Sequence, residues 1–275
     1  MSKKKPKLPE IPQGLRLIDT HTHLYFGEAY PCSEAADAVQ RAIDAGVEFM
    51  IFPGVNLEAI GPMEELHSRF PENTALCAGI HPDDLSDNWP EQLAVMREKM
   101  KEGKYIAVGE IGIDLYRDTS HLDRQKKAFE AQLNWAVDDN LPVVIHCRDG
   151  LEETLEVLAK FSQQQLPRVL FHCFTGTPEQ VRRIREVIPY ALFAVNGVAT
   201  FKNAEEVRDS IKEIGLDYLV LETDAPYLAP TPYRGSRNES AYVPLIAHAV
   251  AETLQLPIEK VAEYTTANAV KFFSL

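Results

Sequence analysis

The sequence predicts a single α/β domain: a closed (β/α)8 barrel of eight parallel strands, or TIM barrel, with helices around it. Short apolar segments rich in β-branched residues alternate along the chain with longer segments that have helical spacing. The chain has 275 residues, and a barrel of this kind typically needs about 250. The competing arrangement is an open sheet with helices on both faces. No Gly-x-Gly-x-x-Gly follows the first strand, which removes the main nucleotide-binding version of that sheet.

Each predicted strand is a short apolar run that is followed by a segment of turn residues or of helical periodicity. In chain order the expected strands are Leu15–Thr20, Phe49–Pro53, Thr74–Ile80, Tyr105–Ile111, Leu141–His146, Arg168–His172, Tyr190–Val195 and Tyr218–Thr223.

The segments between these strands carry apolar residues at helical spacing, most clearly Phe129, Leu133, Ala136 and Val137. The expected helices are Ser33–Ala45, Gly61–Arg69, Pro90–Glu102, Asp123–Asn140, Leu151–Gln163, Pro178–Val187 and Glu205–Ile214, with Tyr242–Leu254 and Ile258–Tyr264 after the last strand. Eight strands with interposed helices favour the barrel. No break in composition divides the chain, so we expect one domain over residues 14–275.

Residues 1–13 carry Lys3, Lys4, Lys5 and Lys7 and have no apolar core. We therefore predict a flexible basic tail rather than a signal peptide. No apolar run is long enough to span a membrane. The four cysteines form no Cys-x-x-Cys pair, which favours a reduced, cytoplasmic setting.

The whole chain is acidic, with 28 basic and 41 acidic residues and a formal net charge of −13. A protein of this charge does not bind nucleic acid through bulk electrostatics. Any polyanionic substrate must therefore be held locally, by metal ions and a few basic side chains.

Two histidines, His21 and His23, follow the apolar run from Leu15 to Ile18. Side chains two residues apart on a strand share a face, so both imidazoles can reach one point in space. Imidazole is the commonest protein ligand for a transition metal. An isolated pair of this kind is more often two polar residues at a strand end, so the metal hypothesis depends on the later strands.

Four later strands also end in a carboxylate or an imidazole, in the order Glu110, His146, His172 and Asp224. A barrel collects its strand ends at the C-terminal mouth, where catalytic residues of this fold lie. Closure makes the first and last strands neighbours, so His21 and His23 can share an ion with Asp224. Singly, each residue has an ordinary alternative, such as an ion pair, a core histidine or a turn cap. Their joint placement predicts a metal site at this mouth.

The neighbours of these residues receive other predicted roles. Cys147 and Cys173 each follow a histidine directly, so on a regular strand they face the helices as buried hydrophobic residues rather than ligands. Glu222 shares a strand face with Asp224, and we expect it to support the ligands. His81, which precedes Pro82, faces the same mouth and is predicted to contact substrate, with a loop cap as its alternative.

Several motifs resemble the signatures of the TatD family of metal-dependent deoxyribonucleases, which belongs to the amidohydrolase-like metal barrels. The motifs are Asp-Thr-His-Thr-His-Leu (19–24), Gly-Ile-His-Pro (79–82), Gly-Glu-Ile-Gly-Ile-Asp (109–114), Leu-Pro-Val-Val-Ile-His-Cys-Arg-Asp (141–149), His-Cys-Phe-Thr-Gly (172–176), Leu-Glu-Thr-Asp-Ala-Pro-Tyr-Leu-Ala-Pro (221–230), Pro-Tyr-Arg-Gly-Ser-Arg-Asn-Glu (232–239) and Thr-Ala-Asn-Ala (266–269). The likeness runs from about Leu17 to Phe273. The chain departs from the family at Tyr25, where relatives often have Asp, and at Cys147, where Ser is common.

The resemblance implies a phosphodiesterase site with two divalent ions. His21 and His23 would hold one ion with Asp224. Glu110 would bridge, and His146 and His172 would hold the second ion. The two departures do not fall on ligand positions, although the loop with Tyr25 can alter the choice of substrate.

The expected reaction is hydrolysis of DNA phosphodiester bonds, from a strand end as in the family. Two divalent ions about 3.5–4 Å apart can activate a water and stabilise both oxygens of an in-line displacement. Mixed ligands of this kind suit Mg, Mn, Zn or Fe, and the sequence does not choose among them. Asp224 is the expected proton acceptor as well as a ligand. Glu110, the expected bridge, is the second predicted catalytic residue.

Two other classes of function remain open at this point. Carboxylate-bridged sites on the same barrel also support hydrolysis of amides, lactones or phosphotriesters. A non-catalytic binding or scaffold protein is the other class, and the intact ligand set argues against it.

The residues expected to hold DNA are basic or aromatic and lie near the mouth. Arg148 comes two residues after a predicted ligand, and Arg234 and Arg237 lie in the loop after Asp224. A guanidinium forms a planar fork that suits phosphate, and Tyr227 can stack on an unpaired base. The alternative is that these arginines pair with surface carboxylates.

Overall fold

The computed structural model describes residues 8–9, 11–12, 14–162 and 165–275. Most of the predicted tail over residues 1–13, with its four lysines, lies outside the described residues, whereas Ile11 packs against the core. No helix in the described part of the chain combines the length and the apolar character that crossing a membrane requires.

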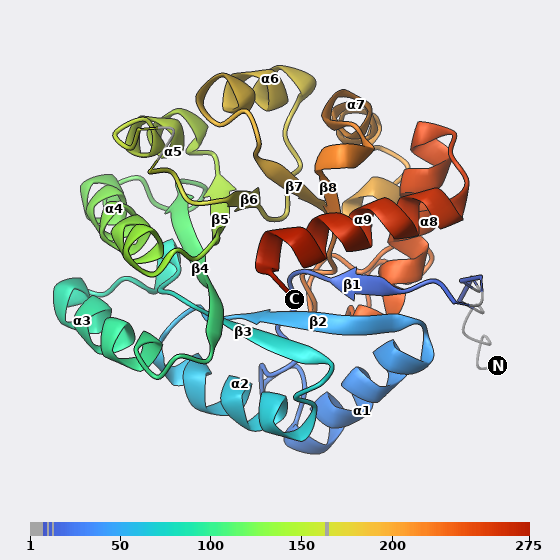
Figure 1. Cartoon of the computed structure of the whole chain (residues 1–275), viewed down its shortest axis with the longest axis horizontal. Helices are drawn as coiled ribbons and strands as arrows, with labels where there is room; N and C mark the ends of the chain where they lie inside the picture. Colours follow the sequence, from blue (N-terminus) through green and yellow to red (C-terminus); the bar gives the residue numbers. More distant parts are fainter. Residues whose placement is uncertain (1–7, 10, 13, 163–164) are drawn as a thin grey trace.

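Eight parallel strands form one sheet in which each strand pairs with the next along the chain (Figure 1). Their bounds are β1 Leu17–Asp19, β2 Val47–Pro53, β3 Thr74–Ala78, β4 Tyr105–Asp114, β5 Val143–Arg148, β6 Val169–Phe171, β7 Leu192–Val195 and β8 Leu219–Leu221. The two edges meet where the amide of Thr20 donates to the carbonyl of Leu221 at 3.0 Å and where Thr22 bridges to Ala225. The predicted barrel is confirmed.

Helices follow the strands and surround the sheet (Figure 1). Their bounds are α1 Cys32–Asp44, α2 Leu57–Arg69, α3 Trp89–Met100, α4 Leu122–Asp139, α5 Leu151–Leu158, α6 Pro178–Val187, α7 Glu205–Ile214, α8 Val243–Leu254 and α9 Ile258–Phe273. Short 3-10 turns lie at η1 Pro82–Asp84, η2 Gly197–Thr200, η3 Leu216–Tyr218 and η4 Ser240–Tyr242. The predicted bounds of α6 and α7 agree with the structure.

Two predicted helix bounds differ from the structure by four or more residues for local reasons. α2 begins at Leu57 rather than Gly61, because the side chain of Asn56 accepts a hydrogen bond from the amide of Ala59 at 2.9 Å and caps an extra turn. α5 ends at Leu158, where the chain tightens and the amide of Phe161 donates to the Leu158 carbonyl at 3.1 Å. The predicted end of α5 at Gln163 falls outside the described residues.

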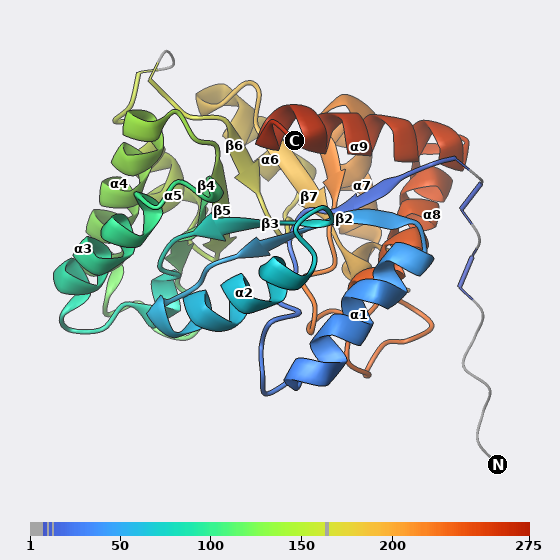
Figure 2. The ribbon, with the colours of Figure 1, turned by 60° about the horizontal axis from the view of Figure 1, so that its bottom comes forward.

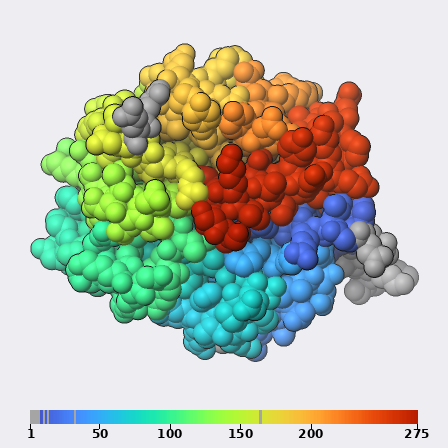
Figure 3. All heavy atoms as spheres, in the orientation of Figure 1, coloured from blue at the N-terminus to red at the C-terminus, as the bar shows by residue number. Residues whose placement is uncertain are grey.

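The last helix, α9, continues to Phe273, beyond its predicted end at Tyr264. Tertiary packing explains the extra turns, because Ala269, Phe272 and Phe273 join a buried apolar layer inside the barrel. That layer takes one residue from each strand, namely Ile18, Ile51, Cys77, Ala107, Val144, Leu170, Ala194 and Val220. Figures 1 and 2 show α9 lying across the strands, and Figure 3 shows it covering the middle of this face. α9 therefore closes one end of the barrel and leaves the mouth at the other.

Candidate metal centre

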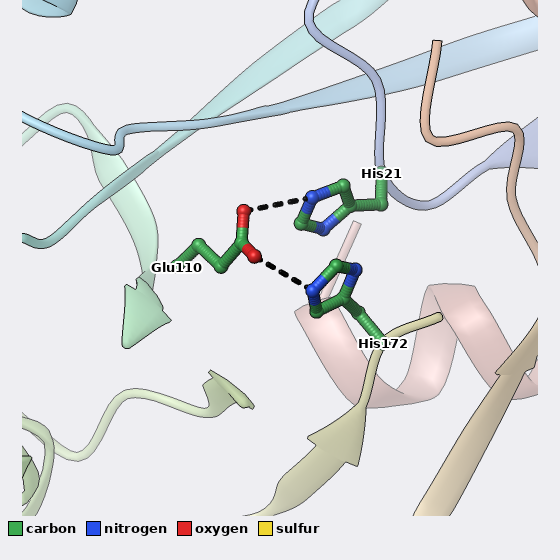
Figure 4. A group of neighbouring side chains, drawn as sticks. All are labelled: His21, Glu110 and His172. Atoms are coloured by element: carbon green, nitrogen blue, oxygen red, sulfur yellow. Dashed lines mark hydrogen bonds and ion pairs between the residues drawn. The ribbon is translucent and has the colours of Figure 1, made fainter. Parts of the chain in front are cut away.

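Glu110 on β4 lies between two groups of histidines at the C-terminal ends of the strands, and Figure 4 shows it between one member of each, His21 and His172. Its Oε2 is 3.1 Å from Nε2 of His21, and its Oε1 is 2.7 Å from Nε2 of His172. The rings of His21 and His172 stack with centroids 3.9 Å apart. The two oxygens of one buried carboxylate therefore face different imidazoles, which is the arrangement that a bridging ligand needs.

The first group combines the end of β1 with the residues after β8. Oδ1 of Asp224 lies 3.8 Å from Nε2 of His21 and 3.6 Å from Nε2 of His23. The two histidine Nε2 atoms are 3.2 Å apart. Asp224 has φ 54°, in the left-handed region that Asp tolerates better than most residues. Barrel closure thus brings Asp224 beside two histidines that lie about two hundred positions earlier in the chain.

The second group lies around Oε1 of Glu110. Nδ1 of His146 is 2.9 Å from this oxygen and 3.1 Å from Nε2 of His172. Nε2 of His81 lies 3.4 Å from the same oxygen, so His81 belongs to the cluster by position. Its Nδ1 also accepts a hydrogen bond from the amide of Asp83 at 3.1 Å. The geometry is thus compatible both with a His81 that caps its loop and with a His81 that contacts substrate, and the contact with substrate stays a prediction.

The buried carboxylate and imidazoles of the cluster have shifted pKa values. Burial, with the nearby His172, lowers the pKa of His21 to about 4, so its imidazole is neutral at pH 7. Burial alone would raise the pKa of Glu110, but the imidazoles of His172 and His21 hold that pKa well below its ordinary value. Burial likewise opposes a charge on His146, yet its hydrogen bonds to Asp114 and Glu110 raise its pKa to about 9. Negative charge is therefore stabilised on Glu110 and positive charge on His146, whereas positive charge is opposed on His21.

The residues present fit divalent metal ions. Their donors are imidazole nitrogens and carboxylate oxygens, a set that binds ions from Mg to Zn. The ring nitrogens approach closely in pairs, at 3.2 Å between His21 and His23. Two nitrogen lone pairs at this distance repel one another unless a proton or a cation lies between them.

Asp114 supports the cluster, although the sequence pattern alone assigns it no role. Its Oδ2 lies 2.8 Å from Nε2 of His146, and its other oxygen accepts a hydrogen bond from the amide of Tyr116 at 2.9 Å. Asp114 is buried and lies at the end of β4. It is four residues after Glu110 on the same strand, so both share one face, and this spacing is the signal that could have identified it.

Glu222 lies behind His172, in a fully buried position. Its Oε1 is 3.9 Å from Nδ1 of His172 and accepts hydrogen bonds from the amide of Cys173 at 2.6 Å and from Asn196 at 3.3 Å. Burial and the nearby Asp224 raise the pKa of Glu222 well above its ordinary value. This position is compatible with the predicted supporting role, which stays a prediction.

The two cysteines next to the histidines are thiols rather than thiolates. Burial raises the pKa of Cys147 to about 11 and that of Cys173 well above its ordinary value. The hydroxyl of Thr154 on α5 contacts the Cys147 sulfur at 3.6 Å, so Cys147 faces a helix as expected, although both cysteines are half-buried rather than buried. Cys173 contacts Asn196, at the end of β7.

A cavity of about 630 Å³ opens beside His172, between the ends of β5 and β6 and the first turns of α5 and α6. Arg148 and Phe174 line it. The guanidinium of Arg148 lies 3.6 Å from the ring centroid of Tyr116, which is 59% exposed and which the sequence pattern did not single out. Arg148 thus lines the same cavity as His172, and its contact with phosphate stays a prediction.

The other predicted substrate contacts, Tyr227, Arg234 and Arg237, follow Asp224 in the chain. Arg237 pairs with Glu34 at 2.6 Å and donates to the carbonyl of Ala29, which agrees with the surface-pair alternative. Arg234 lies over the ring of Phe201, with 4.2 Å from Cζ to the centroid. Tyr227 is 55% exposed, three residues after Asp224. Their phosphate and base contacts stay predictions.

Comparisons with known proteins match nearly the whole chain. A family model described as TatD related DNase matches residues 18–274. The "Uncharacterized metal-dependent hydrolase YabD" of Bacillus subtilis is 36% identical over 259 residues, which cover 94% of this chain and 99% of that protein. The "3'-5' ssDNA/RNA exonuclease TatD" of Erwinia billingiae is 33% identical over 241 residues, which cover 86% of this chain and 92% of that protein. The crystal structure of YJJV, a TatD homologue from Escherichia coli K12, superposes with a TM-score of 0.83 at 30% identity. The match covers 95% of this chain and 99% of that one.

Proposed function

The chain belongs to the TatD-related DNase family of metal-dependent hydrolases, and from that premise we propose that it hydrolyses phosphodiester bonds from an end of single-stranded DNA, with two divalent ions. The division of the Glu110 oxygens between two groups of imidazoles is the observation that carries the proposal. The name of the relative from Erwinia billingiae, a single-strand DNA and RNA exonuclease, supports the choice of substrate.

His21, His23 and Asp224 would hold one ion, His146 and His172 the other, and Glu110 both. Bound there, the ions would supply positive charge for the attacking and leaving oxygens at phosphorus. We assign to Asp224 the acceptance of a proton from the attacking water. Burial opposes its charge, but the neighbouring imidazoles of His23 and His21 lower its pKa, so its carboxylate is ionised near neutral pH and can accept that proton.

Local contacts must hold the DNA, because a chain with a net charge of −13 repels a polyanion overall. Arg148 lies at the edge of the cavity beside His172, where its guanidinium can reach a phosphate next to the cluster. The exposed rings of Tyr116 and Tyr227 offer surfaces for unpaired bases. These few contacts predict modest affinity.

The test combines metal analysis with hydrolysis assays. Protein purified without chelator is analysed for metals and incubated with single- and double-stranded DNA labelled at either end. We expect stepwise shortening from one end of single strands, loss of activity in EDTA, and recovery on adding Mg or Mn. A metal-loaded protein that leaves all DNA intact but cleaves an amide, a lactone or a phosphotriester would overturn the proposal. A protein that binds no metal and cleaves nothing would instead support a binding or scaffold role.

A further inference from the structure

Tyr25 lies just after the first pair of histidines, in a buried position. Its hydroxyl is 3.0 Å from Nδ1 of His23 and also donates to the carbonyl oxygen of Pro53, the last residue of β2. The ring of Phe26 stacks on His23 with centroids 4.5 Å apart and an interplanar angle of 14°. Tyr25 therefore contacts the edge of the His23 ring, and Phe26 covers its face.

These contacts determine where the hydrogen of His23 lies. A carbonyl oxygen only accepts hydrogen bonds, so the single hydrogen of the Tyr25 hydroxyl points to Pro53. Toward His23 the hydroxyl oxygen can then only accept, so Nδ1 must carry the hydrogen. A neutral imidazole carries one ring hydrogen, and Nε2 is left with a lone pair. That atom is 3.6 Å from Oδ1 of Asp224 and 3.7 Å from Oε2 of Glu110, within the candidate ion site.

We propose that Tyr25 is a positioning residue, whose hydroxyl holds His23 in the tautomer that directs the Nε2 lone pair to the first ion. The inference rests on the proposed ion site but not on the proposed substrate. A phenol at this position orients the imidazole without adding a negative charge.

The burial of the site makes this role specific. His23 and Tyr25 are only 3% and 4% exposed, so bulk water cannot readily take the place of the hydroxyl. Tyr25→Phe removes a single oxygen and keeps the ring, which packs edge-on against Phe52 with centroids 6.0 Å apart. The variant leaves Nδ1 of His23 without a partner and lets the other tautomer form.

The matched control is Tyr105→Phe, which makes the same chemical change elsewhere. In the wild-type protein the hydroxyl of Tyr105 donates to Glu64 at 2.6 Å, in a contact between β4 and α2 that involves no candidate ligand. Tyr105→Phe should change neither the tautomer of His23 nor the affinity for metal, whatever its effect on the stability of the fold.

The experiment measures the His23 tautomer and metal affinity, with no DNA present. Two-dimensional ¹⁵N NMR of the metal-free wild-type protein, at a pH where imidazoles are neutral, should show His23 with hydrogen on Nδ1. Tyr25→Phe should show a mixed or reversed tautomer. In calorimetric titration with Zn or Mn, its first ion should bind about 10- to 100-fold more weakly, while circular dichroism matches the wild type.

Two results would overturn the inference. One is a wild-type His23 with its hydrogen on Nε2, which can be seen even if the variant fails to fold. The other is a folded Tyr25→Phe protein that binds both ions with wild-type affinity. Failure of the proposed nuclease function would show differently, as a protein with the expected tautomer and metal affinity that leaves DNA intact.

Discussion

Nε2 of His146 lies 2.8 Å from Oδ2 of Asp114, and this contact turns Nδ1 of the same ring toward Glu110. Asp114→Asn keeps the shape of the side chain but removes its charge. Because partners behind a ligand typically contribute about 10- to 100-fold to metal affinity, we expect the second ion to bind that much more weakly. Calorimetric titration with Mn or Zn measures the loss.

The control for this prediction is Asp123→Asn, since Asp123 pairs with Lys127 on the exposed side of α4. It should leave metal affinity unchanged. If Asp114→Asn binds both ions as the wild type does, then Asp114 does not orient His146.

Glu110→Gln tests the bridge between the two groups. The amide cannot offer two anionic oxygens, so we expect both ions to bind more weakly and hydrolysis to fall by more than about 100-fold, a larger loss than changes behind a ligand cause. The fold should survive, as circular dichroism would show. His172→Ala should deplete mainly one ion, which metal analysis by mass spectrometry can count. Full metal content and full rate in Glu110→Gln would rule out a bridging role.

Arg148 and Arg237 should respond differently to truncation, although the sequence pattern makes them equivalent. Arg148→Ala should lower kcat/KM by about tenfold, the loss expected from one charge-assisted hydrogen bond of roughly 1.5 kcal/mol. It should also reduce the slope of log kcat/KM against log salt by about 0.7, the share of one single-strand phosphate. Steady-state kinetics at several salt concentrations measure both.

Arg237→Ala serves as the comparison, because its guanidinium already pairs with Glu34. Exposed pairs of this kind contribute under about 1 kcal/mol to stability. We expect a small loss of thermal stability and a salt slope like that of the wild type. A reduced slope in Arg237→Ala, with none in Arg148→Ala, would move the phosphate contact to the loop after Asp224.

Gly112 on β4 should tolerate no side chain. Its φ is 145°, and a Cβ at this position would lie 2.0 Å from the carbonyl oxygen of His146. Since that oxygen belongs to the backbone of the neighbouring strand, relief would require β4 and β5 to separate. We expect Gly112→Ala to destabilise the protein by more than about 2 kcal/mol, or to prevent folding. Denaturant unfolding measures the change.

Gly61→Ala is the matched control for Gly112→Ala. Gly61 lies in α2, and an added Cβ would meet nothing within 4 Å. Alanine is a better helix former than glycine by about 1 kcal/mol, so this variant should be as stable as the wild type or more so. A stable, active Gly112→Ala protein would show that β4 and β5 are less closely packed than the structure indicates.

Much of the candidate site could be predicted from the sequence, because its donors lie at strand ends. His21, His146 and Asp224 each follow a short apolar run, and the fold gathers such ends at one mouth. Contacts between side chains from different strands could not be predicted in this way. The carboxylate of Asp114 reaches His146 only after β4 and β5 have paired, so its spacing on β4 indicates its face but not its partner. The hydroxyl of Tyr25 is close to His23 in sequence, but its acceptor, the carbonyl of Pro53, belongs to β2.

The sequence by itself determined the order of strands and helices and which strand ends carry metal-binding groups, since both depend on local periodicity and residue type. Tertiary structure decided which way those groups point. Ala107 and Glu110 both face the barrel interior although they are three residues apart, which strict alternation forbids. The pairing of β4 with β5 shifts register between Val108 and Ile111, and this bulge turns Glu110 inward. A bulge depends on how two strands pair, and one strand's sequence does not contain that information.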